Sequence, residues 1–448
     1  MSARFHFSAS SRSARHANWF HGARWLAIAA SLLLAATAPN AAVPLSLAEA
    51  LSLAESRSSL LTSTDYAAQA AREMAVAAAQ LPDPVATIGV NNLPVNGQDA
   101  WSLTRDFMTM ASVGVMQEFT GKDKREARAD RYRREADKSV AERAAGVAVL
   151  QRDTATAWLD RYYAEAMLTV ISEQSRQARA EVEAAEGGYR AGRGNLADIL
   201  AARSALVMLD DRASEIGRKA RAARIALARW IGERADAPLA GRPAIDTLAL
   251  DARALDAELI HHPELAVLTR QEDLAAAEVR VAQANRQPDW SVALMYNQRG
   301  SAYSNMISLN VSVPLQWDRV DRQDREVAAK LALLDQARAE REDKVRAHAG
   351  EVRQMIAEWE NDRERLARYE RELLPLAAQR TDATLAAYRG AKANLADVLQ
   401  ARRGEIDVRV QSLQLEMDTA RVWAQLNFLY PDVGHPPRGA LSHSKDLQ

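Results

Sequence analysis

The stretch YRGAKANLADVLQAR at residues 388–402 repeats the stretch YRAGRGNLADILAAR at residues 189–203, and nine of the fifteen positions are identical. Two further echoes follow the same order along the chain: QLPDPVATIGV (80–90) with RQPDWSVALMY (286–296), and SVGVMQEFTGKDKREARA (112–129) with NVSVPLQWDRVDRQDREV (310–327). Self-similarity at a long, nearly constant spacing is typical of a duplicated unit. The sequence therefore predicts two tandem repeats, each with the order helix, two extended segments, long helix, turn, helix.

Composition places the boundaries of these repeats. The segment GERADAPLAGRPAID (232–246) contains two prolines and two glycines, which is typical of a linker. It separates a first repeat at 43–231 from a second repeat at 247–431. The expected turns between helices lie near 189–195 and 388–394, and residues 432–448 are expected to form a disordered tail.

The first 42 residues have the pattern of an export signal. Four arginines precede or flank the apolar run WLAIAASLLLAA (25–36), and small residues follow in TAPNAA (37–42). The apolar run is shorter than the roughly 20 residues of a membrane-spanning helix. A short buried helix is the alternative interpretation. The chain has no cysteine, so disulfides, thiolate metal sites and a lipid-modified N-terminal cysteine are excluded.

Two long runs favour extended helices over a compact core. Residues 121–189 and 319–388 are rich in Ala, Arg and Glu, and each run of about 70 residues would extend about 100 Å as a helix. Ala155, Leu159 and Tyr162 recur at helical spacing. Pro375 interrupts the second run, where it predicts a kink or a break. The formal net charge is −1, so no basic surface indicates nucleic-acid binding.

The extended segments alternate between apolar and polar residues. In MISLNVSVPLQW (306–317) the apolar residues occupy every second position, and WSVALMYNQ (290–298) has the same pattern. The segments 85–93 and 112–119 are weaker examples. A strand of about 9–11 residues suits a tilted membrane strand. Phe119, Trp290 and Trp317 are expected at one end of the sheet, where aromatic residues mark a membrane interface. A soluble β-sandwich is the alternative.

Four strands cannot close a membrane barrel, because the smallest known spanning barrels have eight. Open strand edges in lipid are prohibitively costly. The strands of one chain are therefore expected to be completed by strands of other copies: a dimer would supply eight and a trimer twelve. The same copies would also supply neighbours for the long helices.

Over residues 43–431 the chain resembles the TolC family of outer-membrane efflux proteins. The resemblance is carried by LSLAEALSLAE (45–55), HHPELAVL (261–268) and the two turn sequences. It implies a mainly α-helical fold with membrane β-structure: a homotrimer whose 12-stranded β-barrel in the outer membrane continues as a long α-helical barrel across the periplasm. It also implies partners, an inner-membrane pump and a periplasmic adaptor, for which the trimer is the exit duct. GVNNLPVNG (89–97) and RDFMTMASVGVMQEFTGKDKREAR (105–128) are similar to the branch that serves heavy-metal pumps of the resistance-nodulation-division class.

The resemblance places the two turns at the periplasmic tip, where hydrogen bonds and ion pairs close the entrance. The gate residues expected there are Tyr189, Arg190, Arg193, Asn195, Asp198, Tyr388, Arg389, Lys392, Asn394 and Asp397. If three copies assemble as the resemblance implies, three Asp397 side chains would face one another. Asp397 is therefore the best candidate for a ring of carboxylates, which would attract cations.

The same residues also have a purely structural explanation. Asn195 and Asn394 stand where a helix N-cap is required, and an aspartate follows each of them three residues later. Glycines such as Gly192 and Gly390 permit the left-handed backbone of a tight turn. The tyrosines and basic residues could equally serve packing and solvation.

No motif of a catalytic site occurs, so no catalytic residue, cofactor, metal ligand or enzymatic activity is assigned. His261 and His262 are adjacent and make a poor chelate. Methionines gather in or near the strands, and thioethers suit Cu(I), although methionine also serves as an ordinary lipid-facing or packing residue. They are Met108, Met110, Met116, Met295 and Met306.

Two alternatives without a pore remain open at this stage. The first is a periplasmic adaptor, which would have one helical hairpin flanked by Gly-rich lipoyl-like halves. The second is a coiled-coil scaffold, which would leave the alternating segments unexplained.

Overall fold

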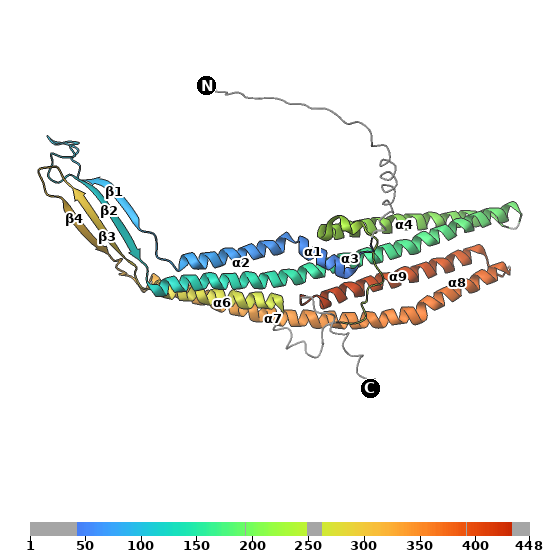
Figure 1. Cartoon of the computed structure of the whole chain (residues 1–448). Coiled ribbons are helices and arrows are strands. Elements are labelled where there is room, and N and C mark those ends of the chain that lie inside the picture. Colours follow the sequence, from blue (N-terminus) through green and yellow to red (C-terminus); the bar gives the residue numbers. More distant parts are fainter. Residues whose placement is uncertain (1–42, 193, 249–261, 391, 432–448) are drawn as a thin grey trace, which may run out of the picture. The chain divides into compact units, whose positions relative to one another are not determined.

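A computed structural model describes residues 43–192, 194–248, 262–390 and 392–431 (Figure 1). The expected export signal, the expected tail, Arg193 and His261 lie outside these residues. Every element below belongs to one unit, which begins at Leu45. Within the described residues, no helix combines the length and the apolarity that crossing a membrane requires.

The two halves of this unit have the same order of elements. The first half contains α1 (Leu47–Arg57), α2 (Ser59–Ala78), β1 (Val85–Asn91), β2 (Met110–Phe119), α3 (Lys122–Arg190), α4 (Leu196–Ile231) and the 3₁₀ turn η1 (Gly232–Asp236). The second half contains α6 (Pro263–Ala284), β3 (Trp290–Gln298), β4 (Met306–Ser312), α7 (Gln323–Arg368), the π-helical turn η3 (Tyr369–Leu373), α8 (Leu374–Arg389) and α9 (Leu395–Asn427). In both halves a strand pair thus separates a shorter helix from a long helical hairpin.

The long helix differs between the halves because of one proline. Helix α3 runs unbroken for 69 residues. In the second half Pro375, at the start of α8, cannot donate a hydrogen bond to the carbonyl of Arg371, and its ring crowds the preceding turn. The π-helical turn η3 lies directly before it and widens the helix at this point. The predicted interruption is therefore a π-turn between α7 and α8.

The strands form one antiparallel sheet with the order β1-β2-β3-β4. Its central pair joins the two halves, since β2 belongs to the first repeat and β3 to the second. Two predicted strands are too long: β1 ends at Asn91 instead of residue 93, and β4 ends at Ser312 instead of residue 317. Pro314 follows β4 closely and has no N–H to extend the ladder, which accounts for the second difference.

The two faces of the sheet are chemically different. One face presents exposed apolar side chains from all four strands, namely Ile88, Val90, Val113, Val115, Leu294, Tyr296, Ile307, Leu309 and Val311. The opposite face carries a hydrogen-bonded polar chain. Asn91 donates to Ser112 (2.7 Å), Ser112 donates to Asn297 (2.6 Å), and Asn297 donates to Ser308 (3.0 Å). An exposed apolar face opposite a satisfied polar face is the arrangement that period-two alternation predicts.

The main core lies where the linker between the repeats meets the long helices. Three indole N–H groups hold main-chain oxygens there: Trp158 bonds Leu45 (3.2 Å), Trp359 bonds Ile245 (3.3 Å) and Trp423 bonds Thr247 (2.8 Å). Leu45 also forms a parallel bridge with Leu239 of the linker. The expected linker is thus an ordered strap, pinned to both halves through buried tryptophans.

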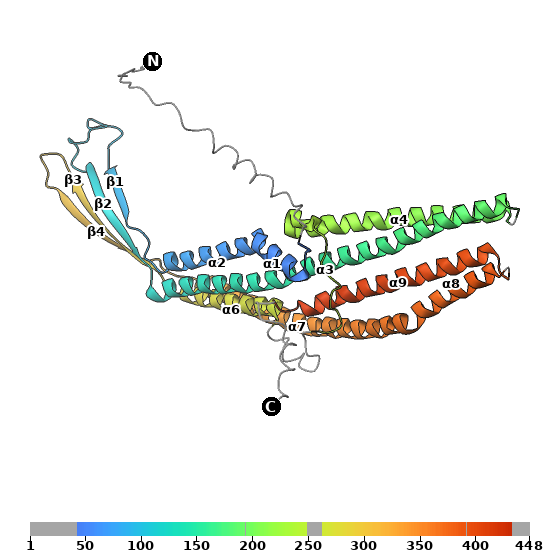
Figure 2. The same cartoon turned by 45° about the vertical axis from the view of Figure 1, so that its right-hand side comes forward.

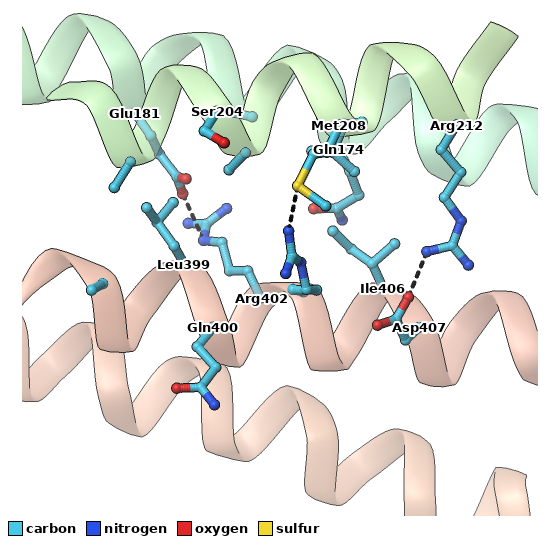
Figure 3. Close-up of a pocket in the computed structure, with 16 residues that line it drawn as sticks. Gln174, Glu181, Ser204, Met208, Arg212, Leu399, Gln400, Arg402, Ile406 and Asp407 are labelled. Atoms are coloured by element: carbon cyan, nitrogen blue, oxygen red, sulfur yellow. Dashed lines mark hydrogen bonds and ion pairs between the residues drawn. The ribbon is translucent and has the colours of Figure 1, made fainter. Parts of the chain in front are cut away.

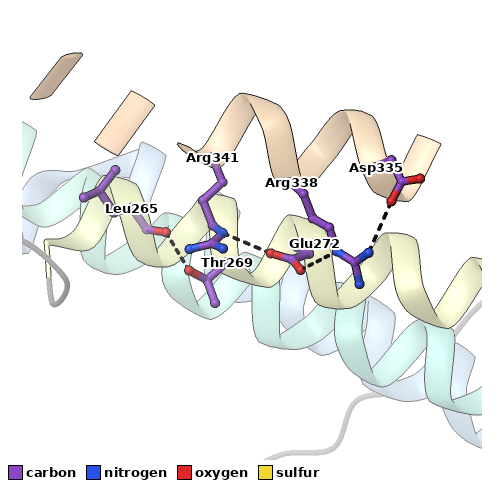
Figure 4. Close-up of polar contacts among 6 residues, drawn as sticks. All are labelled: Leu265, Thr269, Glu272, Asp335, Arg338 and Arg341. Atoms are coloured by element: carbon purple, nitrogen blue, oxygen red, sulfur yellow. Dashed lines mark hydrogen bonds and ion pairs between the residues drawn. The ribbon is translucent and has the colours of Figure 1, made fainter. Parts of the chain in front are cut away.

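Away from this core, ion pairs accompany a thin apolar seam between α6 and α7. The carboxylate of Glu272 on α6 accepts from Arg338 (3.1 Å) and Arg341 (3.0 Å) of α7 (Figure 4). Glu278 on α6 pairs with Lys330 of α7 at 2.6 Å. Partly exposed pairs contribute about 0.2–1 kcal/mol each. Their main effect is to fix how the two helices align.

Candidate functional site

The turn between α3 and α4 is built as the repeat sequence predicts. Gly192 has φ +70°, so its left-handed backbone favours glycine. Asn195 caps α4: its side-chain oxygen accepts from the N–H of Asp198 (2.8 Å), and the Asp198 carboxylate accepts from the N–H of Asn195 (3.3 Å). This reciprocal capping box satisfies two backbone donors at the helix start.

The turn between α8 and α9 repeats the cap. The N–H of Asp397 donates to the Asn394 side chain (2.9 Å), and the N–H of Asn394 donates to the Asp397 carboxylate (3.1 Å). The expectation of a left-handed Gly390 is wrong, because its φ is −84°. Gly390 occupies the position of Ala191 in the first turn, which has the same φ. The counterpart of Gly192 is residue 391, which lies outside the described residues.

The other expected gate side chains project from these turns into solvent. Tyr189 and Tyr388 are 49 % and 41 % exposed, and Arg389 and Lys392 are also exposed. Arg190 donates to the carbonyl of Glu186 in its own helix (3.3 Å). Within one chain the hydrogen bonds found at the two tips therefore stay inside each turn and do not join one hairpin to the other.

The hairpins α3–α4 and α8–α9 run side by side and end at the same side of the molecule (Figure 2). A small apolar cluster joins them there, formed by Ala185 of α3, Ile199 and Ala202 of α4, and Leu395 of α9. Leu395 directly follows the capping residue Asn394. The cap and the contact between hairpins are thus adjacent in the chain.

A groove with a volume of about 600 Å³ runs behind this cluster between α3, α4 and α9 (Figure 3). Along this groove, three arginines, Arg402, Arg403 and Arg212, each link one hairpin to the other. On α9, Arg402 pairs with Glu181 of α3 at 2.7 Å and also donates to Gln177 at 3.0 Å. The groove lining further includes Gln174, Ser204, Leu399, Gln400 and Ile406.

The remaining two links join α4 to α9. Arg403 donates to the Met208 sulfur at 2.7 Å, and Arg212 pairs with Asp407. Both links are more exposed than the contact between Glu181 and Arg402, whose side chains are 17 % and 24 % exposed. Burial raises the pKa of Glu181, and the nearby Arg402 guanidinium acts in the opposite direction. Removing Arg402 would therefore leave the Glu181 carboxylate partly buried without a cation, which is less favourable than breaking either of the two more exposed links.

The repeat explains how this link arises. Arg402 is the counterpart of Arg203, the last residue of the first copy of the motif. Arg203 pairs with Glu186 at 2.6 Å inside its own hairpin. The residue equivalent to Glu186 in the second hairpin is Leu385, which cannot pair with Arg402. Arg402 instead reaches the other hairpin, so the duplicated arginine became a connection between the two.

Sequence reasoning missed Glu181, Arg402 and the other cross-links, although Arg402 ends the motif that it singled out. Aligning the two repeats shows that Leu385 replaces Glu186, so Arg402 needs an acidic partner outside its own hairpin. No group of three His, Asp or Glu side chains that could hold a metal ion occurs within 43–192, 194–248, 262–390 and 392–431.

Comparison with known proteins finds a likeness to one family model and to several solved structures. Residues 254–430 match the family model of outer membrane efflux proteins. No curated protein matches the chain. Among solved structures, the outer-membrane channel OprN has 18 % identity and a TM-score of 0.71, over 86 % of this chain and 89 % of that one.

Two further structures agree with this match. CusC has 16 % identity and a TM-score of 0.72, over 86 % of this chain and 92 % of that one. The outer membrane protein VceC from Vibrio cholerae has 17 % identity and a TM-score of 0.67, over 86 % of this chain and 95 % of that one. At these identities the likeness establishes the fold.

Proposed function

We propose that this chain, a member of the outer membrane efflux protein family, is the outer-membrane exit duct of a tripartite efflux system. In this proposal three copies assemble into one tube, with the strands in the outer membrane and the helices in the periplasm. A periplasmic adaptor protein joins the tube to an inner-membrane pump, which selects the substrate. The chain performs no chemistry on what passes.

The observation that carries the proposal is the sheet itself. It ends in two edges, β1 and β4, and no other strand among the described residues pairs with their outer hydrogen-bonding groups. Its apolar face is open, with Ile88 and Ile307 83 % and 74 % exposed. Such a sheet alone in water would invite aggregation. Pairing β4 of one copy with β1 of the next removes the edges, and lipid covers the apolar face.

The aromatic residues at one end of the sheet fit this placement. Phe119 and Trp290 are cross-strand partners whose rings stack with centroids 4.4 Å apart. Trp317 follows β4 at the same end and is 89 % exposed. We place these three residues at the periplasmic interface of the membrane, because they lie next to helices in the chain: α3 begins after Phe119, α6 ends before Trp290 and α7 begins after Trp317.

In the same proposal the helical tips form the entrance of the tube. The exposed side chains of the two turns, Tyr189 and Arg190 with Tyr388, Arg389 and Asp397, can meet those of neighbouring copies, and the half-buried Asp198 lies beside them. The links across the groove, above all Glu181–Arg402, hold the two hairpins of one copy together. Docking of an adaptor would open the entrance by moving one hairpin against the other.

Heavy-metal cations are the substrate class that we propose. Asp397 is exposed, and threefold symmetry would bring three of its carboxylates to one level of the entrance. A ring of carboxylates concentrates cations and slows anions.

The function is tested by the conductance of the purified full chain in planar lipid bilayers. We expect discrete channel openings that divalent cations block, and a weaker block for Asp397→Asn, which retains a side-chain oxygen at the cap. Absence of channels, with recovery of the protein as a soluble monomer, would instead favour an adaptor or a scaffold. Unchanged divalent block in Asp397→Asn would remove the carboxylate ring from the proposal.

A further inference from the structure

The loop between β1 and β2 contains the dipeptide Asn96-Gly97, and no other Asn-Gly pair occurs in the entire sequence. This loop lies at the end of the sheet away from the helices, because α2 precedes β1 and α3 follows β2. The N–H of Trp101 donates to the carbonyl of Pro94 (2.7 Å), which closes a short segment around the dipeptide. Both residues of the pair are exposed, so water reaches them freely.

Turn formation accounts for the glycine of this pair. Gly97 has φ +84°, a backbone conformation that favours glycine, and its carbonyl accepts from the N–H of Ala100 (3.3 Å). Its own N–H has no hydrogen-bond acceptor in the part of the chain that the structure describes. The Gly97 nitrogen is therefore not held by a hydrogen bond.

The Asn96 side chain takes no part in this turn. Its amide forms no hydrogen bond with any of the described residues. Two asparagines nearby differ in this respect: Asn91 donates to the Ser112 hydroxyl (2.7 Å), and Asn92 donates to the carbonyl of Met108 (3.4 Å). Asn96 is thus an exposed and unbonded amide, followed by a residue that has no Cβ.

These conditions favour attack of a backbone nitrogen on the side chain that precedes it. The Gly97 nitrogen loses its proton and bonds to the Cγ of Asn96, the Cγ–N bond of the amide breaks, and the amide nitrogen leaves with that proton as ammonia. Water then opens the resulting succinimide ring at either carbonyl. One opening gives aspartate, and the other gives isoaspartate. A Cβ on the second residue would crowd the attacking nitrogen, and glycine has none.

We infer that Asn96-Gly97 is a self-modifying site, at which Asn96 converts without an enzyme to aspartate and isoaspartate. Water is the single reactant besides the chain. Each conversion replaces a neutral amide with a carboxylate, and isoaspartate also lengthens the main chain by a methylene group. Conversion requires only the exposed loop. Its effect on transport rests on the proposed function, in which three copies would place three new carboxylates at the outer mouth of the tube.

Peptide mass spectrometry of the purified full chain in detergent tests this inference. The protein is incubated in mildly alkaline and in mildly acidic buffer, and electron-transfer fragmentation distinguishes isoaspartate from aspartate. Asn92 is the internal control, because it lies in the same loop but precedes Leu93 and is hydrogen-bonded. We expect Asn96 to be lost at least about tenfold faster than Asn92, and faster in the alkaline buffer, since the attacking nitrogen must lose its proton. Equal loss at the two asparagines, or aspartate without isoaspartate at residue 96, would overturn the inference.

The variant Gly97→Ala tests the role of the glycine. A Cβ at Gly97 meets no atom within 4 Å, so the loop has room for it, and the cost is the strain of alanine at φ +84°. We expect conversion of Asn96 to slow at least about tenfold in this variant. Conversion at the native rate would contradict the mechanism.

The variant Asn96→Asp carries the charge of the product from the start. In planar bilayers its channels should prefer cations more strongly than native channels that have not been aged. An unchanged preference would contradict the effect on transport. A chain that converts Asn96 but forms no channel would retain the modification site and remove the proposed function, and a channel whose Asn96 stays intact would do the reverse.

Discussion

At the scale of single residues, His262 shows how a buried side chain fixes one protonation state. It is 4 % exposed, and its Nδ1 accepts from the N–H of Glu264 at 3.3 Å, which caps α6. The backbone of Leu429 also forms a hydrogen bond with His262, and the ring centroid of His348 lies 4.1 Å from that of His262. Burial first, and His348 second, lower the pKa of His262 from 6.5 to about 4. Protonation at Nδ1 would replace the cap acceptor with a donor.

This environment predicts that acid destabilises the junction of α6 and the end of α9. The unfolded chain takes up a proton as the pH falls through 6.5, while the folded chain resists until about pH 4. Stability is therefore complete above pH 6.5 and is lost between pH 6.5 and pH 4, by about 3 kcal/mol in total. Thermal unfolding should occur at lower temperature at pH 4.5 than at pH 7.5.

The matched variant is His262→Asn, which keeps a capping oxygen but does not titrate. Between pH 7.5 and pH 4.5, the unfolding temperature of this variant should fall clearly less than that of the native chain. Parallel curves for the two proteins would show that His262 does not cause the acid sensitivity. Lys344 acts on His262, and Glu351 pairs with His348. Both groups are present in both proteins, so the comparison cancels their effect.

At the scale of elements, the two hairpins differ in where a repeated arginine finds its partner. Arg203 pairs within the first hairpin, and Arg402 pairs across to Glu181. We expect Arg402→Ala to loosen the second hairpin by about 1–2 kcal/mol, because it leaves the Glu181 carboxylate partly buried without its cation. Amide hydrogen exchange in the α8–α9 tip should then be about tenfold faster.

Arg203→Ala is the internal control for this prediction. It removes an equivalent arginine from the same kind of helix, but its ion pair does not join the hairpins. Exchange at the α8–α9 tip should remain near the native rate in this variant. If both alanine variants speed exchange there equally, the link between hairpins has no special role.

The helices and turns also differ in how far the sequence could predict them. Local signals were sufficient for the capping boxes at Asn195 and Asn394, because a cap depends on residues three positions apart. They also placed both strands of each pair and the interruption at Pro375. The partner of Arg402 could not be predicted, because Glu181 lies 221 residues away in the chain and meets it only when the hairpins pack. The prediction of a left-handed backbone at Gly390 was wrong because Gly390 aligns with Ala191 and not with Gly192.

At the scale of the whole molecule, the central claim is that the sheet of one chain is completed by neighbouring copies. Absence of cysteine from the entire sequence makes this claim directly accessible, since engineered cysteines have no native competitor. The two edge strands of one sheet are separated by three strand spacings, about 14 Å. That exceeds the roughly 7 Å limit between Cα atoms in a disulfide, so a bond between β1 and β4 must join two copies.

The most direct measurement is therefore disulfide formation between edge strands in native membranes. Thr87→Cys on β1 is combined in turn with Ser308→Cys, Asn310→Cys and Ser312→Cys on β4, which covers three registers of the unknown junction. We predict that at least one pair gives covalent dimers and trimers, and no larger species, on a non-reducing gel. Monomers alone for all three pairs, or ladders that continue beyond three copies, would contradict a closed trimeric tube.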